Sequence, residues 1–121
     1  MTPDPALAAE QYCYLTTTGR VTGNPHTIEI WFALENGTLY LMAGGRDQTD
    51  WVRNLRRHPE ISLRIRDQRF QGRARVVDPA SDEDTLARRL LVAKYANTGY
   101  GGDLSGWGRT ALPVAIDFDV R

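Results

Sequence analysis

The amino-acid sequence predicts a mainly β (α+β) fold, a six-stranded antiparallel split β-barrel with two flanking helices. Three observations predict it: six short segments have strand character, only two long segments have helical character, and most connections are short turns. The turns at Asn36-Gly37 and Asp67-Gln68 are too short for the crossover that a parallel pair requires. They argue against the parallel sheet that helices between strands would otherwise favour.

The N-terminal part of the chain predicts one short helix and one strand. Residues 1–5 carry two prolines and form a lead-in, and Ala6–Tyr12 contains residues that favour a short helix. Cys13–Thr18 is rich in β-branched and aromatic residues, which is typical of a strand. We expect this strand to end in a loop at residues 19–25, which contain two glycines and a proline.

A β-hairpin is expected next, formed by His26–Leu34 and Leu39–Ala43. The Asn36-Gly37 pair between these apolar segments is the strongest short signal for a hairpin turn. Alternation divides the first strand into two faces. One face would carry Ile28, Ile30, Phe32 and Leu34, and the other Thr27, Glu29, Trp31 and Ala33.

A helix is predicted at Asp50–Arg57, after Gly44-Gly45-Arg46 has ended the hairpin. Asp47 or Thr49 would cap the start of this helix, and His58 before a proline marks its end. Its buried stripe would consist of Trp51, Val52 and Leu55.

Two further strands are predicted at Glu60–Arg66 and Arg69–Val77, joined by the tight turn at Asp67-Gln68. Ser81 would then cap a second helix that runs to about Tyr95, with acidic residues in its first turn. This helix would bury Leu86, Leu90, Leu91 and Ala93.

The last part of the chain predicts an irregular loop and a closing strand. Residues 97–110 contain five glycines, which argues against regular structure there, and long irregular stretches in small domains are often functional. The closing strand is expected at Val114–Val120, introduced by Pro113.

Composition limits the classes of function. The 121 residues fit one domain, residues 1–121. Lys+Arg and Asp+Glu are equal at 15 each, so no global field would attract nucleic acid. No apolar run approaches the ~20 residues of a membrane span, and no signal-peptide pattern is present. We therefore expect no nucleic-acid partner, no integral membrane segment and a cytoplasmic location.

No residue pattern predicts a self-contained catalytic centre or a metal site. His26 and His58 are the only histidines, and neither has a cysteine or carboxylate at ligand spacing. Both are therefore expected to be plain surface residues. Cys13 opens an apolar strand, which favours a buried, inert thiol over a nucleophile. Hydrolase and phosphate-binding glycine motifs are absent as well.

Two loops rich in glycine and arginine remain, at residues 19–23 and 44–46. In the expected hairpin, the start of one strand lies beside the end of the other, so both loops would meet at one end. Glycines let a ligand approach the backbone, and Arg20 and Arg46 carry fixed positive charge suited to phosphate. The other interpretation is two ordinary turns with solvated arginines.

A family resemblance favours the ligand-site interpretation. The sequence resembles the deazaflavin-dependent nitroreductase-like oxidoreductases of the split-β-barrel flavoprotein superfamily, in consistent order over about residues 12–120. The residues that carry this resemblance are Leu15-Thr16-Thr17-Thr18-Gly19-Arg20-Val21-Thr22-Gly23-Asn24-Pro25, His26-Thr27-Ile28-Glu29-Ile30-Trp31-Phe32, Asn36-Gly37, Tyr40-Leu41-Met42-Ala43-Gly44-Gly45, Asp50-Trp51-Val52-Arg53-Asn54-Leu55, His58-Pro59, Gly72-Arg73-Ala74 and Ala111-Leu112-Pro113-Val114-Ala115-Ile116.

The resemblance implies a six-stranded split barrel, usually a homodimer, that binds the deazaflavin coenzyme F-420 in a groove beside the barrel. By position, the cofactor-binding roles fall on Arg20, Thr22, Gly23, Ile28, Ala43, Gly44, Gly45, Arg46, Trp51 and Asn54. Two positions depart from the family pattern. Many members have Lys where Val21 stands, and Ser-Lys-Gly-Gly where this chain has Met42-Ala43-Gly44-Gly45. Arg46, Arg53, Arg56 and Arg57 either compensate for the missing lysines or belong to a solvated helix face.

The resemblance also implies hydride transfer from the reduced coenzyme to a small-molecule electron acceptor, such as a quinone or a nitroaromatic. Such chemistry requires no nucleophilic side chain. Tyr95 or Tyr100 is a candidate proton donor, with a packing role as the alternative. Two other functions stay open: an FMN-dependent oxidoreductase of the same fold, and a non-catalytic carrier of a cofactor or ligand.

Overall fold

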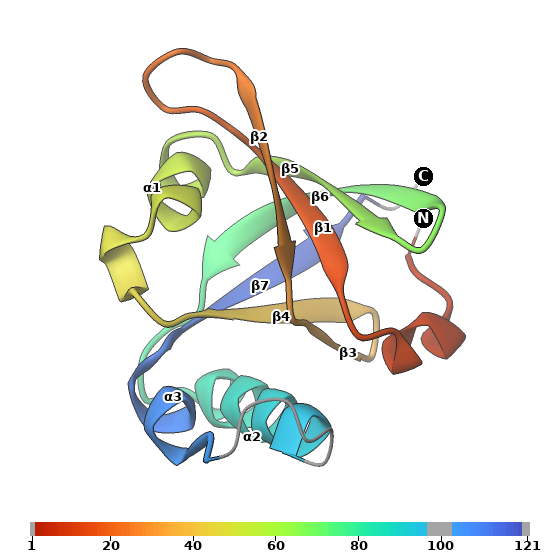
Figure 1. Cartoon of the computed structure of the whole chain (residues 1–121), viewed down its shortest axis with the longest axis vertical. Helices are drawn as coiled ribbons and strands as arrows, with labels where there is room; N and C mark the ends of the chain where they lie inside the picture. Colours follow the sequence, from red (N-terminus) through yellow and green to blue (C-terminus); the bar gives the residue numbers. More distant parts are fainter. Residues whose placement is uncertain (1, 97–102, 120–121) are drawn as a thin grey trace.

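The structure, a computed structural model, describes residues 2–96 and 103–119. Within them, seven strands form one antiparallel sheet, in the order β2-β1-β5-β6-β7-β4-β3 (Figure 1). The strands are β1 (Cys13–Thr18), β2 (Pro25–Ile30), β3 (Ala33–Glu35), β4 (Thr38–Ala43), β5 (Glu60–Ile65), β6 (Gln68–Val76) and β7 (Leu112–Phe118). The helices are η1 (Pro5–Ala9), η2 (Arg46–Gln48), α1 (Asp50–Arg57), α2 (Asp82–Ala96) and α3 (Ser105–Thr110).

The prediction of six strands was wrong, because the segment expected as one strand at 26–34 forms two. β2 pairs with β1, whereas β3 pairs with β4. These two pairs lie at opposite edges of the sheet. Only residues 31 and 32 join β2 to β3, so the two edges must approach each other. The sheet is therefore curled into a half-barrel that is not closed by hydrogen bonds between β2 and β3.

Side chains of α2 explain the break between β2 and β3. The backbone N–H of Phe32 donates to the hydroxyl of Tyr95 at 2.9 Å, and the Phe32 carbonyl accepts from Lys94 Nζ at 2.8 Å. Tyr95 and Lys94 thus use the backbone groups that a continuous strand would offer to its neighbours. The alternating pattern of residues 26–34 could not predict these long-range contacts.

The pairing expected for the central hairpin is confirmed only at its turn. Asn36 and Gly37 have φ angles of 51° and 80°, as a two-residue hairpin turn requires, and they join the short β3 to β4. The loop at residues 19–24 instead joins β1 to β2. It is therefore the turn of a separate hairpin.

The two long helices have the predicted positions. α1 has the predicted bounds, and α2 begins at Asp82, where the hydroxyl of Ser81 accepts from the backbone N–H of Asp84 at 3.1 Å. Ala93, however, is exposed rather than buried. At the N-terminus, the predicted helix is replaced by the shorter 3-10 helix η1.

α3 lies in the stretch that was expected to lack regular structure, so that prediction was wrong for residues 105–110. Its glycines allow close packing. A Cβ atom at Gly108 would lie 2.6 Å from a methyl group of Val92, so glycine lets α3 approach α2. Arg88 of α2 also donates to the carbonyls of Gly108 and Arg109, at 3.1 and 3.0 Å, which fixes the end of α3.

Apolar side chains form two cores. The larger core fills the curled sheet and includes Cys13, whose burial raises the pKa of its thiol to about 12, as expected of an inert cysteine. The smaller core lies between the sheet and the pair α2 and α3. No helix in the described ranges has the length and apolar character that crossing a membrane requires.

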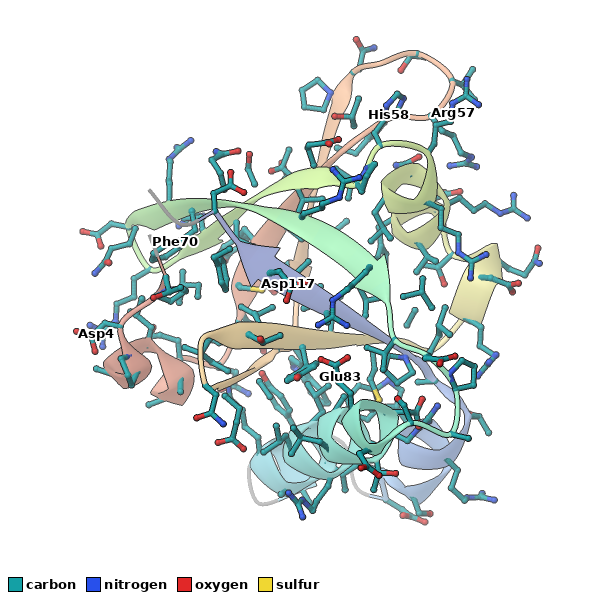
Figure 2. All side chains as sticks on the ribbon, turned by 180° about the vertical axis from the view of Figure 1, so that it is seen from behind. Asp4, Arg57, His58, Phe70, Glu83 and Asp117 are labelled. Carbon is teal, nitrogen blue, oxygen red and sulfur yellow. The ribbon has the colours of Figure 1, made fainter. Side chains whose placement is uncertain are left out.

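An ion-pair network fixes α2 to the sheet. Arg75 of β6 contacts Glu83 of α2 and Asp117 of β7, each at 2.6 Å, and Figure 2 shows the two carboxylates on their separate elements. Tyr40 of β4 also donates to Glu83 at 2.9 Å. The hydrogen bonds from Arg75 lower the pKa of Glu83, which keeps this network charged at neutral pH.

Candidate functional site

A cavity of about 670 Å³ lies between the β1–β2 loop and the start of α1. In Figure 1 this loop projects beyond the sheet on the side where α1 lies. The cavity is lined by Thr17, Gly19, Arg20, Val21, Thr22, Asn24, His26, Thr27, Ile28, Thr49, Asp50, Trp51 and Asn54.

Backbone hydrogen bonds hold the β1–β2 loop narrow. Gly19 donates to the carbonyl of Asn24 at 2.7 Å, and Gly23 donates to the carbonyl of Gly19 at 2.9 Å. A Cβ atom at Gly19 would lie 2.8 Å from Nε2 of His26, so a larger residue would displace that ring. Gly23 has a φ of +77°, which glycine adopts without strain. The two glycines therefore shape one wall of the cavity.

Asn54 positions Arg20 at the cavity. Its side-chain oxygen accepts from the backbone N–H of Arg20 at 3.1 Å and from the guanidinium at 2.9 Å. Its amide donates to the hydroxyl of Thr17 at 3.2 Å, and Asn54 itself is buried. The second terminal nitrogen of Arg20 contacts the carboxylate of Asp50 at 3.2 Å. Arg20 is thus held across the first turn of α1.

The start of α1 offers further groups for an anionic ligand. The first backbone N–H groups of a helix have no partner within it, and the helix dipole is positive at this end. Thr49 occupies the cap position without making a side-chain cap bond. Its hydroxyl oxygen is buried and has no hydrogen-bond partner among the described residues. Together with Arg20, this end of α1 has the chemistry that binds phosphate or carboxylate groups.

The structure brings five of the ten predicted cofactor-binding residues to this cavity. These five are Arg20, Thr22, Ile28, Trp51 and Asn54. Gly23 belongs to the same loop without lining the cavity. Trp51 also packs against the larger core, in agreement with its predicted place in the buried stripe of α1.

The remaining four predicted residues, at 43–46, do not line the cavity. Ala43 is buried in the core, and Gly44 is exposed near Trp107. Gly45 lies close to Thr49, which lines the cavity, because a Cβ atom at Gly45 would be 2.7 Å from the Thr49 hydroxyl. Arg46 donates to the carbonyl of Thr110. The expectation that Arg20 and Arg46 meet rested on pairing β2 with β4, and the sheet pairs β2 with β1 instead.

Six residues that line the cavity had no predicted side-chain role toward a ligand. They are Thr17, Asn24, His26, Thr27, Thr49 and Asp50. His26 was expected to be a plain surface residue; it is exposed, but it borders the cavity. The signal that identifies most of this group is the hairpin formed by β1 and β2. Once these strands are paired, residues on both sides of the loop share one wall.

The two tyrosines considered as proton donors lie outside this cavity or outside the described residues. Tyr100 is not among the described residues, so its role stays a prediction. Tyr95 is buried, and its ring stacks on Trp31 with 4.1 Å between the ring centroids. Its hydroxyl lies 2.7 Å from the Gln11 carbonyl and 3.0 Å from the Phe32 carbonyl. Burial raises the pKa of Tyr95, and the residue lines neither cavity described in this section.

A second, more apolar cavity of about 410 Å³ lies beside α3. Trp31 and Trp107 meet there edge to face, with centroids 5.7 Å apart. Ile28 borders the first cavity and Ile30 the second, and alternate residues of a strand share a face. The two cavities are therefore bordered by neighbouring residues on one face of β2. The second is lined by Tyr12, Glu29, Ile30, Trp31, Met42, Leu104 and Trp107.

The arginines of α1 that were considered as compensating charges lie on its exposed side and do not line the cavity. Arg53 donates to the side chain of Gln48 at 2.6 Å. Figure 2 places Arg57 and His58 toward the end of the molecule where the β1–β2 loop projects. A solvated helix face describes their observed position. In the described part of the chain, no group of three or more histidine, cysteine or acidic residues has the geometry of a metal site.

Comparison with known proteins adds a family match. The family described as F420H(2)-dependent quinone reductase matches residues 6–119. A conserved hypothetical protein from Mycobacterium tuberculosis is 20% identical, with a TM-score of 0.74 over 99% of this chain and 83% of that chain. An F420-H2 dependent reductase is 21% identical, with a TM-score of 0.70 over 88% of this chain and 93% of that chain. A structure described as a domain-swapped dimer is 20% identical, with a TM-score of 0.70 over 88% and 79%.

Proposed function

The chain belongs to the F420H(2)-dependent quinone reductase family, and from this premise we propose that it reduces a quinone, a nitroaromatic or a similar conjugated acceptor. It is an oxidoreductase and its cofactor is coenzyme F-420. When bound in its reduced form, this coenzyme supplies a hydride. A hydride and one proton together convert a quinone to a hydroquinone. The task of the protein is to hold two ring systems together and to exclude water.

The cavity beside α1 is the observation that carries this proposal. Its volume of about 670 Å³ falls within the range of ~300–1,000 Å³ that is typical of cofactor sites. Arg20, the Thr49 hydroxyl and the first turn of α1 would bind the phosphate, while Ile28 and Trp51 would contact the deazaflavin ring. The buried hydroxyl of Thr49, which has no partner within the described residues, fits a ligand with polar groups at this end. The residues present thus match an aromatic ring joined to an anionic tail.

We place the acceptor in the cavity beside α3. Trp31, Met42 and Trp107 give it an aromatic, apolar lining that suits a flat conjugated molecule. Ile28, which borders the first cavity, and Ile30, which borders the second, lie about 7 Å apart along β2, because alternate strand residues are separated by that distance. A ring bound at Ile28 would therefore lie next to an acceptor bound at Ile30.

We further propose that the protein is a homodimer. One solved structure with this fold is described as a domain-swapped dimer, which supports the proposal. Light scattering at micromolar protein concentration tests it. A mass of about twice the 13.6 kDa chain is expected, and a monomer would contradict it.

The cofactor site is tested by fluorescence titration of the purified protein with coenzyme F-420 and, in parallel, with FMN. Saturable binding that favours the deazaflavin, followed by oxidation of the reduced coenzyme when a quinone or nitroaromatic is added, is the expected result. Preference for FMN would transfer the chemistry to the flavin class. Tight binding of coenzyme F-420 without turnover of any acceptor would instead identify a carrier.

A further inference from the structure

The cavity beside α1 contains one carboxylate and one guanidinium, which face each other. Among residues 2–96 and 103–119, Asp50 is the only acidic residue that lines it, and Arg20 is the only lysine or arginine. They form an ion pair at 3.2 Å. We propose that Asp50 determines specificity at this site by competing with the anionic part of the ligand for Arg20. This inference rests on the proposed binding of coenzyme F-420.

Hydrogen bonds to Asn54 restrict the position of the Arg20 side chain. Asn54 accepts hydrogen bonds from both its backbone and its guanidinium, at 3.1 and 2.9 Å. Asn54 is only 4% exposed and is itself bonded to Thr17. The guanidinium is planar, so fixing one terminal nitrogen restricts where the other can point. That other nitrogen faces Asp50, so an anionic ligand that binds this nitrogen meets Asp50 there.

The side chain of Asp50 is free to rotate away from Arg20 when an anionic ligand binds. Its side chain is 85% exposed, and Arg20 is its only hydrogen-bond or ion-pair partner among the described residues. It stands at the first position of α1, so rotation toward solvent disturbs no buried contact. Exposed ion pairs are weak, and this pair therefore lowers the affinity for an anion without blocking the site.

The effect distinguishes ligands by charge. A phosphate or a carboxylate tail needs Arg20 and is repelled by Asp50, whereas a neutral ring system needs neither contact. Removing the charge of Asp50 should therefore tighten binding of an anionic ligand and leave a neutral one unchanged. The size of an exposed ion pair corresponds to a change of about 2- to 5-fold in the dissociation constant at low salt. High salt should reduce this change, because Asp50 is exposed and Arg20 is partly exposed.

The test compares Asp50→Asn with the wild type and with Asp47→Asn, a control on the adjoining helix η2 that lies outside the cavity lining. Each protein is titrated with coenzyme F-420 and with the same deazaflavin lacking the phosphate and the glutamate tail. We expect only D50N to change affinity, and only for the anionic coenzyme. Equal affinities of D50N and the wild type, or equal changes for both ligands, would overturn the inference. Failure of every variant to bind coenzyme F-420 would remove the proposed function itself.

A double-mutant cycle separates competition from simple repulsion. If Asp50 acts through Arg20, the gain from D50N should disappear in an Arg20→Ala background. A gain of the same size in that background would show that Asp50 repels the ligand directly, and it would overturn the competition. Thermal unfolding of all variants checks that each is folded.

Discussion

The cavity beside α1 is made of two stretches of chain, residues 17–28 and 49–54, whereas the cavity beside α3 collects residues 12, 29–31, 42 and 104–107. The first stretch is a single hairpin, and the second is the start of one helix. Local sequence features, mainly glycines and a cap position, shape this cavity. Substitutions of residues that line this cavity should therefore change ligand affinity more than the free energy of unfolding.

The cavity beside α3 depends instead on contacts between distant residues. Tyr95 and Lys94 of α2 hold the backbone of Phe32, and Tyr95 stacks on Trp31. Arg88 holds the end of α3, which carries Trp107. Figure 1 shows α2 and α3 together on one side of the sheet, apart from α1. Changes in these supports should therefore alter stability together with acceptor binding.

Arg20→Ala should give the largest effect on the cofactor side. It removes a charge-assisted contact of about 1.5–3 kcal/mol, so binding of coenzyme F-420 should weaken roughly 10- to 150-fold. Arg46→Ala is the matched control, because Arg46 is bonded to the carbonyl of Thr110 outside the cavity. Fluorescence titration measures both. Equal losses in the two variants would mean that the anionic part of the coenzyme is bound elsewhere.

Tyr95→Phe should give the corresponding effect on the α3 side. The variant keeps the ring that stacks on Trp31 and leaves the buried N–H of Phe32 without its acceptor. Such a loss costs about 1–3 kcal/mol of the free energy of unfolding, which urea denaturation measures. Tyr14→Phe is the control, because the hydroxyl of Tyr14 donates to exposed Glu29. If both variants were equally stable, the hydroxyl of Tyr95 would not hold the junction of β2 and β3.

The same contrast explains what the sequence predicts well. Local signals give α1, the cap at Ser81, the Asn36-Gly37 turn and the whole of β1, because each depends on a few neighbouring residues. The division of residues 25–35 into two strands depends on Tyr95 and Lys94, some 60 positions away in the sequence. A pattern read along one segment has no access to such a contact.

In the candidate site, too, some residues could be predicted from the sequence, whereas others depend on contacts between distant parts of the chain. The family resemblance gave ten residues, of which Arg20, Thr22, Ile28, Trp51 and Asn54 line the cavity, whereas Gly23 and residues 43–46 do not. No side-chain role toward a ligand was predicted for Thr49 or Asp50, because their exposure to a cavity depends on where the β1–β2 loop folds over them. The aromatic lining beside α3 was not predicted at all, because it forms only when Trp107 of α3 meets Trp31.

Trp107→Ala should separate the two cavities functionally. It removes an aromatic side chain that lines the cavity beside α3, and an aromatic contact with a bound acceptor is worth about 0.5–1.5 kcal/mol, so the KM for an aromatic acceptor should rise roughly 2- to 12-fold. The affinity for coenzyme F-420 should stay unchanged, because Trp107 does not line the first cavity. Steady-state kinetics and a parallel coenzyme titration measure the two quantities. A change confined to coenzyme affinity would place the acceptor elsewhere.

The smallest expected effect is a pH dependence at Lys94, on the α2 side of the comparison. Burial lowers the pKa of Lys94 from 10.5 to about 8, although its Nζ donates to the carbonyls of Glu10 and Phe32. Between these two values the unfolded chain binds the proton and the folded chain releases it, so the Lys94 contribution to stability rises with pH. Because Lys94 is partly exposed, we expect a rise of only about 1 kcal/mol between pH 7.5 and 9.5.

The measurement is the free energy of unfolding of the wild type minus that of Lys94→Met at each pH, which cancels the titration of Cys13 and the tyrosines. If this difference in the free energy of unfolding stayed constant or fell with pH, the Lys94 amine would be fully hydrated. Tyr95 alone would then connect α2 to the junction of β2 and β3.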